Sequence, residues 1–153
     1  NLFISETKIR FEVTNISLTS KLIDGTFPDY ERVIPKTNTK IMTVKTHDFA
    51  SSIDRVATIS SDKSKAVKFA INNNSLTLTV INPDAGTAVE KVDVSYEADD
   101  LEVGFNARYL LDIASQISGD TMTFTLEDPG APALINDSAH EDATYVLMPM
   151  RVW

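Results

Sequence analysis

The side chains in this sequence best suited to acid–base or metal chemistry are two histidines and three pairs of adjacent carboxylates. His47 precedes an amphipathic stretch, whereas His140 lies in a polar loop far along the chain. The carboxylate pairs are Asp99-Asp100, Glu127-Asp128 and Glu141-Asp142. A metal or catalytic centre needs such groups to converge, and adjacent residues of an extended chain point to opposite faces. We therefore predict that the histidines lie on the surface and that the pairs lie in turns.

The remaining motifs indicate no catalytic site. Residues 82–86, Asn-Pro-Asp-Ala-Gly, begin like a cation-binding loop but lack the alternating oxygen ligands and the closing Glu of an EF-hand, so we predict a turn. The sequence contains no glycine-rich phosphate loop, nucleophile elbow or HExxH motif. It therefore predicts a protein that is not an enzyme and that uses no metal or cofactor.

Two apolar segments that contain proline are better candidates for a functional site. They are Phe27-Pro28 with Val33-Ile34-Pro35, and Val146 to Met150. Pro149 lacks an N–H donor and suits a strand end or an edge strand. Met148 and Met150, if they face outward, would give an adaptable surface for the apolar anchors of a peptide. On the residues alone, a binding surface and an ordinary part of the core both stay open.

Alternating apolar residues predict two strands before these segments, at residues 9–13 and 16–19, joined at Thr14-Asn15. A two-stranded ribbon is barely stable alone in water, so we expect it to belong to a larger sheet. Asn1 is not an initiator residue, so we expect the chain to begin after processing or after a cut within a longer protein.

The rest of the chain repeats one order of elements, β-α-β-β-β, twice. The first copy is predicted as a strand at 39–46, a helix at 47–60 capped by Thr46 or Asp48, and strands at 65–72, 75–82 and 87–96. The second copy is predicted as a strand at 101–105, a helix from its cap at Asn106 to Gly119, and strands at 121–127, 132–137 and 144–152. This order predicts an α+β fold with two helices packed on one side of an antiparallel sheet.

Charge is distributed unevenly along the 153 residues. The net charge is −8, but residues 1–68 carry 11 basic and 8 acidic side chains, whereas residues 69–153 carry 3 and 14. A polyanion would therefore favour the first part of the chain, although acidic loops that only solvate the second part also explain the pattern. No apolar run of about 18 residues occurs, so no membrane role is predicted. The absence of Cys is compatible with a reducing compartment.

Several motifs together resemble the bacterial sliding clamp family, the β subunit of the replicative DNA polymerase III holoenzyme. The matching segments are Ser20 to Gly25, Phe27 to Tyr30, Arg32 to Pro35, Gly104 to Asn106, Tyr109 to Asp112 and Tyr145 to Arg151. They occur in the family's order over essentially the whole chain. The resemblance implies a DNA-clamp fold, with residues 1–26 as the last strands of a middle clamp domain and residues 27–153 as the C-terminal clamp domain.

In that family, two three-domain subunits close a head-to-tail ring around duplex DNA, with helices that line the hole. The resemblance therefore implies a DNA replication processivity factor of the bacterial cytoplasm, associated with the nucleoid and homodimeric at full length. Its implied partners are double-stranded DNA, the DNA polymerase III α subunit, the clamp loader, and other polymerases or repair proteins that carry clamp-binding peptides. The alternative is a peptide-binding module without DNA encirclement. The present chain is expected to be monomeric and to form no ring.

The resemblance also implies the positions of the functional residues. An apolar groove for clamp-binding peptides would be formed by Pro28, Arg32, Val33, Asn106, Tyr109, Val146, Met148, Pro149, Met150 and Arg151. Arg55 and Arg108 are implied as positions that face DNA, and Thr58 and Ile59, together with the strand at 87–96, as a subunit interface. The family's groove is completed by a middle domain of which this chain holds only the end, so weaker peptide binding is expected here. Gly130 and Pro132 are expected to change the shape of its wall.

Overall fold

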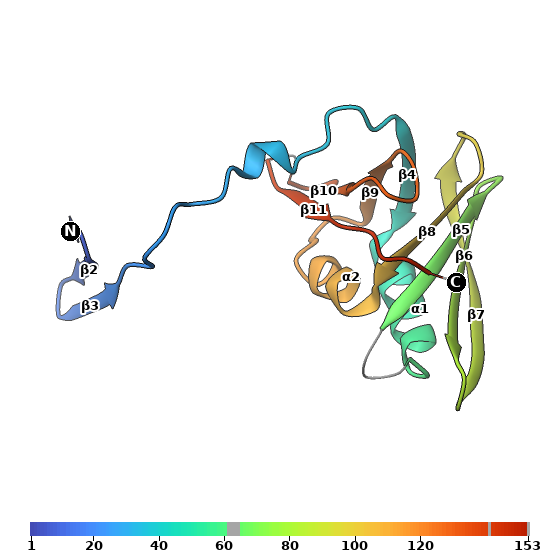
Figure 1. Cartoon of the computed structure of the whole chain (residues 1–153), viewed down its shortest axis with the longest axis horizontal. Coiled ribbons are helices and arrows are strands. Elements are labelled where there is room, and N and C mark those ends of the chain that lie inside the picture. Colours follow the sequence, from blue (N-terminus) through green and yellow to red (C-terminus); the bar gives the residue numbers. More distant parts are fainter. Residues whose placement is uncertain (61–64, 141, 153) are drawn as a thin grey trace. The chain divides into compact units, whose positions relative to one another are not determined.

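The computed structural model describes residues 1–60, 65–140 and 142–152. The chain divides into two compact units, Asn1–Tyr30 and Glu31–Trp153 (Figure 1), which are described separately below. The family resemblance implied a boundary between residues 26 and 27, whereas this division falls between residues 30 and 31. A short 3-10 helix, η1 (Tyr30–Arg32), lies at the junction.

The first unit is a three-stranded antiparallel sheet of β1 (Leu2–Ile4), β2 (Lys8–Val13) and β3 (Ile16–Lys21). The predicted hairpin is confirmed, and Thr14 makes its tight turn with a positive φ of 38°. Strand β1 was not predicted, because three residues are too few to display an alternating pattern. Apolar side chains of all three strands are exposed, among them Ile4 at 67% and Ile16 at 75%. This sheet therefore lacks a covering layer within its own unit.

The second unit contains one eight-stranded antiparallel sheet in the order β11-β10-β9-β4-β7-β6-β5-β8. Its first four strands are β4 (Lys40–Lys45), β5 (Ala66–Asn72), β6 (Ser75–Asn82) and β7 (Gly86–Tyr96). The other four are β8 (Leu101–Asn106), β9 (Thr121–Leu126), β10 (Ala133–Asp137) and β11 (Thr144–Leu147). The predicted tight turn between β5 and β6 is confirmed by Asn73 and Asn74, which both have positive φ.

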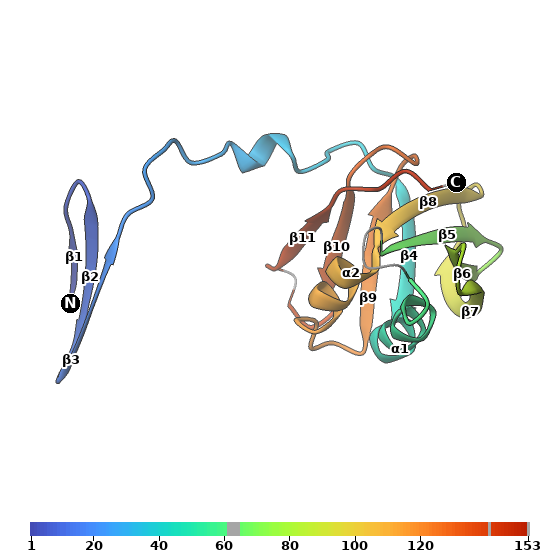
Figure 2. The ribbon, with the colours of Figure 1, turned by 60° about the horizontal axis from the view of Figure 1, so that its bottom comes forward.

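Two helices, α1 (Thr46–Ala57) and α2 (Ala107–Ala114), lie side by side on one face of the curved sheet (Figure 2). Phe49 of α1 lies with its ring centroid 5.9 Å from that of Phe69 on β5 and 5.3 Å from that of Phe124 on β9. The aromatic core therefore joins one helix to strands from both copies of the repeat. The predicted α+β architecture, with two helices on one side of an antiparallel sheet, is confirmed. Neither helix, within the described residues, is long and apolar enough to cross a membrane.

The two helices begin differently. The predicted cap of α2 is confirmed, because the Asn106 side chain accepts a hydrogen bond from the Arg108 N–H at 2.9 Å. The predicted caps of α1 are wrong, since its cap position is Lys45, which makes no side-chain capping bond. Thr46 instead donates its hydroxyl to the Gly119 carbonyl at 2.9 Å, so tertiary contact takes the group that would otherwise cap the helix.

The two copies of the repeat meet the rest of the sheet differently. In the first copy, β4 pairs with β7 through Met42–Val44 and Val94–Tyr96. In the second copy the corresponding elements are β8 and the C-terminal segment, and their described residues meet at one isolated bridge between Gly104 and Met150. We call the first contact the closed seam and the second the open seam. The open seam contains the candidate site.

Candidate functional site

The C-terminal segment leaves the sheet earlier than predicted. The sequence indicated a strand at 144–152, but β11 ends at Leu147. Pro149 has no N–H to donate to a ladder, which is the physical reason for the early end. The chain then crosses to the opposite edge of the sheet, where the Met150 N–H donates to the Gly104 carbonyl at 2.8 Å. Residues 148–152 therefore form a strap across the open seam.

Gly104 allows this strap to approach β8 closely. A Cβ atom at this position would lie 2.3 Å from Val152 Cγ1 and 2.7 Å from the Met150 carbonyl oxygen. Both distances are shorter than a van der Waals contact, and the second involves backbone that has no rotamer to change. A larger residue at Gly104 would therefore displace the strap.

The strap has a mostly apolar depression on its α2 side, which we call the helix-side pocket. Its volume is about 400 Å³, and it is lined by Tyr109, Asp112, Ile113, Val146, Leu147 and Met148. Tyr109 is 56% exposed and Met148 59% exposed, so two large apolar side chains face solvent at its rim. The Asn106 cap fixes the start of α2 one turn before Tyr109. This pocket can accept apolar side chains of a partner.

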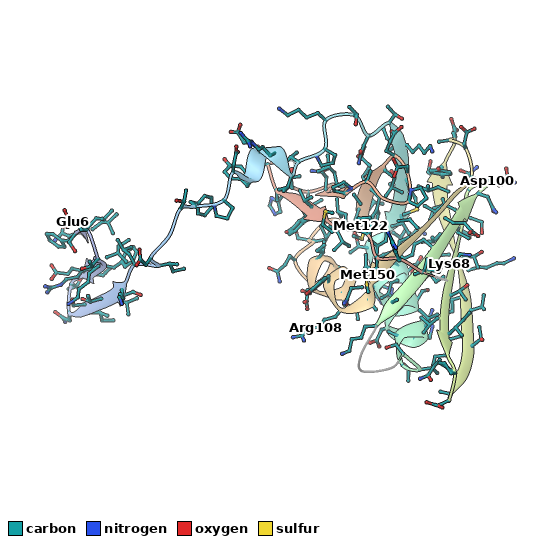
Figure 3. All side chains as sticks on the ribbon, viewed as in Figure 1. Glu6, Lys68, Asp100, Arg108, Met122 and Met150 are labelled. Carbon is teal, nitrogen blue, oxygen red and sulfur yellow. The ribbon has the colours of Figure 1, made fainter. Side chains whose placement is uncertain are left out.

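A second depression lies on the other side of the strap, and we call it the β8-side pocket. Its volume is about 540 Å³. The lining residues are Lys68, Glu102, Val103, Gly104, Pro129, Gly130, Met148, Pro149, Met150, Arg151 and Val152. Met148 lines both pockets, so they adjoin at this side chain. Figure 3 shows Lys68 and Met150 where the strap crosses β8 and β5.

The structure brings together six of the ten residues predicted for the groove. They are Tyr109, Val146, Met148, Pro149, Met150 and Arg151. Asn106 acts behind this surface as the cap of α2. Arg32 and Val33 lie at and just after η1, exposed, and do not appear in the lining of either pocket among the described residues. Pro28 belongs to the first unit. The groove roles of these last three residues stay predictions.

Sequence reasoning missed several lining residues. Lys68 and Glu102 come from strands β5 and β8 that are distant from the apolar motifs, and Ile113 was taken only as part of the apolar stripe of α2. A glycine within the alternating strand at 101–105 was the available signal for Gly104, since such a glycine marks a close approach of another segment. Gly130 does line the β8-side pocket, and Pro132 accepts a hydrogen bond from the Asn38 side chain at 2.8 Å.

Asp137 at the end of β10 holds the loop that follows α2. Its carboxylate accepts hydrogen bonds from the backbone N–H groups of Ala139, Ser118 and Gly119 at 2.8 to 3.0 Å, and from the Ser118 hydroxyl at 3.2 Å. These donors, the Ala139 N–H first, lower the pKa of Asp137 below its ordinary value despite its burial. The loop is thus fastened to the strand beside β11, and with it the C-terminal end of α2.

The two arginines predicted to face DNA differ in their surroundings. Arg55 forms a bidentate pair with Glu90 on β7, with Nη2 2.7 Å from Oε2, and also donates to the Ser52 hydroxyl at 3.0 Å. This pairing raises the pKa of Arg55 and lowers that of Glu90. Arg108 is 72% exposed and projects from α2 (Figure 3), and within the described part of the chain its charged group has one distant contact, of 4.0 Å to Asp112. Arg108 therefore has more capacity for a phosphate than Arg55.

The predicted interface positions lie at the end of α1. Thr58 is exposed, and its hydroxyl donates to the Asp54 carbonyl at 3.1 Å. Ile59 is half-buried against the core, and its carbonyl accepts from the Asn82 side chain at 2.6 Å. Nearby, residues 86–93 of β7 pair with β6 on one side, whereas pairing with β4 involves only Val94–Tyr96. Within the described residues, the first part of β7 is therefore an open edge.

The remaining expectations concern polar surface residues. His47 and His140 are exposed, as predicted, and residues 83–85 form the predicted turn. Asp99-Asp100 and Asp128 lie in loops, as predicted. Glu127 also follows a strand, but its carboxylate accepts hydrogen bonds from the N–H and the hydroxyl of Thr39, so it has a structural role in addition to its contact with solvent. Glu141 lies outside the described residues. Within the described ranges, no cluster of three potential ligands could hold a metal ion.

The curved antiparallel sheet with two helices on one face defines a domain of the DNA-clamp class. The chain belongs to the family described as DNA polymerase III beta subunit, C-terminal domain, which matches residues 31–151. The beta sliding clamp of Caulobacter vibrioides is 51% identical over 152 residues, which is 99% of this chain and 41% of that protein. The corresponding protein of Pseudomonas aeruginosa is 34% identical, with coverage of 99% and 41%.

Solved structures give the same result. A crystal structure of the sliding clamp from Bartonella birtlesii bound to griselimycin superimposes with a TM-score of 0.96 at 52% identity, and covers 99% of this chain and 41% of that chain. A sliding clamp structure from Pseudomonas aeruginosa with a ligand has a TM-score of 0.95 at 34% identity, with the same coverage. The chain therefore spans about two fifths of the length of these relatives.

Proposed function

We propose that this chain is the C-terminal part of a replication sliding clamp, a ring that encircles duplex DNA and keeps a polymerase on its template without catalysing a reaction. The family match over residues 31–151 carries this proposal. In this proposal the first unit is the end of a middle clamp domain, which explains why its apolar side chains lack a cover here. The ring would act at the nucleoid, in the bacterial cytoplasm.

We propose further that the two pockets around Met148 form the groove in which partner proteins dock a short peptide. These partners would be the polymerase α subunit, the clamp loader and repair proteins. The support is geometric, because six predicted groove residues line two adjoining depressions with an exposed methionine between them. Burial of two apolar anchor side chains would contribute about 3 to 6 kcal/mol before ordering costs, which suits exchangeable partners.

The groove is tested by titrating a Gln-Leu-x-Leu-Phe peptide against this chain by calorimetry. Met148→Glu should weaken binding by about tenfold or more, because it places a charge where an apolar anchor is buried. Val33→Glu should also weaken binding if the segment after η1 contributes to the groove. Ile41→Glu is the matched control, since Ile41 is 56% exposed on β4 and lines neither pocket.

The outcomes separate the parts of this proposal. Equal binding to wild type and to Met148→Glu would reject the groove. Loss of binding with Met148→Glu, together with unchanged binding to Val33→Glu, would keep the two pockets and remove Val33 from the site. A loss with Ile41→Glu as large as that with Met148→Glu would indicate binding that does not depend on the groove.

Ring formation would use the end of α1 and the open edge of β7. An open strand edge can pair with a strand of another chain, and Thr58 and Ile59 lie at the neighbouring helix end. We expect the present chain to be monomeric in light scattering, and a longer protein with all three domains to be dimeric and to remain on circular DNA. A closed-ring dimer of the present chain would contradict this expectation. Arg108 would contribute more than Arg55 to contact with DNA in the ring.

A further inference from the structure

The β8-side pocket has a charged end that the apolar groove does not require. Lys68 of β5 and Glu102 of β8 face this end, and Lys68 Nζ lies 2.9 Å from Glu102 Oε2. The Lys68 side chain is only 21% exposed, whereas that of Glu102 is 64% exposed. The lysine is therefore held at the wall of the pocket, and its partner lies on the solvent side of the pair.

The lining of this pocket is more basic than the acidic second part of the chain, residues 69–153, that forms most of it. Residues 69–153 contain only three basic side chains against 14 acidic ones. One of the three, Arg151, lines the same pocket as Lys68, and Glu102 is the one acidic side chain among the described lining residues. The pocket wall thus carries a net positive charge on a protein whose net charge is −8.

We propose that this end of the pocket binds an acidic side chain that flanks the apolar anchors of a docked peptide. The inference rests on the proposed peptide groove and adds the partner chemistry at one end of it. The carboxylate of the peptide takes the position of Glu102 at Lys68 and is shared with Arg151, while Glu102 turns to solvent. Met148 lines both pockets, so one peptide can fill the helix-side pocket and still reach Lys68.

Charge complementarity decides between an acidic and a basic flank. A basic residue of the peptide would be repelled by Lys68 and Arg151 and could pair only with the exposed Glu102. An acidic residue could pair with both cations. An exposed pair between charged side chains contributes little, but Lys68 is mostly shielded from solvent, which strengthens its interaction with a carboxylate.

The test compares peptides that share the same two apolar anchors and differ at one flanking residue, Glu or Gln. The flanking residue is placed before the anchors in one pair of peptides and after them in another. Calorimetry on the whole 153-residue chain should show a preference for Glu of about fivefold on one side of the anchors. Added salt should reduce this preference, because it screens the charges.

Three variants assign the preference to the pocket. Lys68→Gln should abolish the preference for Glu, measured as the ratio of the affinities for the Glu and the Gln peptide. Glu102→Gln should increase the preference, because it removes the competing carboxylate. Lys45→Gln removes an exposed lysine at the end of β4 and should change neither affinity. Thermal unfolding of each variant verifies that the fold is retained.

The failures of the two proposals are distinguishable. If none of the peptides binds, both the proposed peptide groove and the acidic subsite are rejected. If the Gln peptides bind and the Glu peptides bind no better on either side, the groove stands and the acidic subsite is rejected. A preference for Glu that survives Lys68→Gln would likewise reject the assignment to this pocket.

Discussion

The closed and open seams are two versions of one connection. Thr43 and Gly104 each lie three residues before the first residue of the following helix, so they are corresponding positions of the repeat. Thr43 opposes Ser95 within a three-residue ladder, whereas Gly104 opposes Met150 in a single bridge. The closed seam is regular sheet. The open seam replaces the ladder with the strap, and a pocket lies on each side of it.

This difference shows how a repeated fold can present one apolar groove and not two. A depression of about 350 Å³ also lies beside α1 and β7 in the first copy, but it is lined mostly by polar side chains (His47, Asp48, Ser51, Ser52, Arg55, Lys91, Val92 and Asp93). At the open seam, Pro149 ends the pairing and Gly104 lets the strap cross β8 closely. Side chains that a complete strand would pair and cover are left exposed around Met148.

The largest effect on this comparison is expected from Gly104→Val. The new side chain would occupy the place of Val152 and the Met150 carbonyl, so the strap should leave β8 and stability should fall by about 3 kcal/mol. Peptide binding should be lost with it, because both pockets use the strap. Urea denaturation and peptide titration measure the two effects.

Thr43→Val is the matched control at the closed seam. Thr43 already carries a β-branched side chain, and its hydroxyl makes only a 3.4 Å contact with that of Thr123, so stability should change by less than about 0.5 kcal/mol. Equal destabilisation by Gly104→Val and Thr43→Val would show that the two seams do not differ as described.

A smaller effect is expected at two adjacent residues where β11 leads into the strap, Leu147 and Met148. Leu147 is 6% exposed and belongs to the core, whereas Met148 is 59% exposed. Leu147→Ala should lower stability by about 2 kcal/mol, because it leaves a cavity. Met148→Ala should leave stability nearly unchanged and weaken peptide binding several-fold. Thermal unfolding and titration of both variants test this separation, and a stability loss of similar size in both would contradict it.

The smallest difference concerns the loops after the two helices. In the first copy, the neutral side chain of Asn82 at the end of β6 donates to the Ile59 carbonyl, whereas in the second copy the carboxylate of Asp137 at the end of β10 accepts four hydrogen bonds. Because the pKa of Asp137 is lowered by folding, its contribution to stability is present above the ordinary carboxyl pKa of 3.8 and is lost as pH falls below that value.

Asp137→Asn should therefore lower stability at neutral pH, and the variant should lose less further stability on acidification than the wild type does. Denaturation in urea at neutral pH and near pH 3 measures this difference in slope. Asn82→Ala is the control, because it removes a neutral group and should leave the pH dependence unchanged. Parallel pH profiles of wild type and Asp137→Asn would refute the role of the carboxylate.

The sequence predicted most of the fold, because long alternating strands and two amphipathic helices carry strong periodic signals. The errors lie where tertiary contacts override the local pattern. Residues 148–152 continue an apolar run, but the early strand end depends on Pro149 and on the position of β8. The cap of α1 was mispredicted because Thr46 is used by Gly119, a residue far along the chain.

The site was predicted where its residues are close in sequence. The family resemblance implied Tyr109, Val146 and Met148 to Arg151, and these residues line the two pockets. Lys68 and Glu102 were not named, because only the pairing of β5 with β8 places them beside the strap. A polar residue at a half-exposed strand position gives no local signal of this kind.

The hydrogen bond from the Met150 N–H to the Gly104 carbonyl also provides a probe of how often the strap moves away from β8. Pro149 has no N–H, so the Met150 amide is the first one after β11 that is held against β8. Its exchange with deuterium requires that this bond break, and the exchange rate therefore measures how often the strap lifts from the sheet. A peptide that binds across the strap should slow exchange at this single amide, while amides of the closed seam keep their rates.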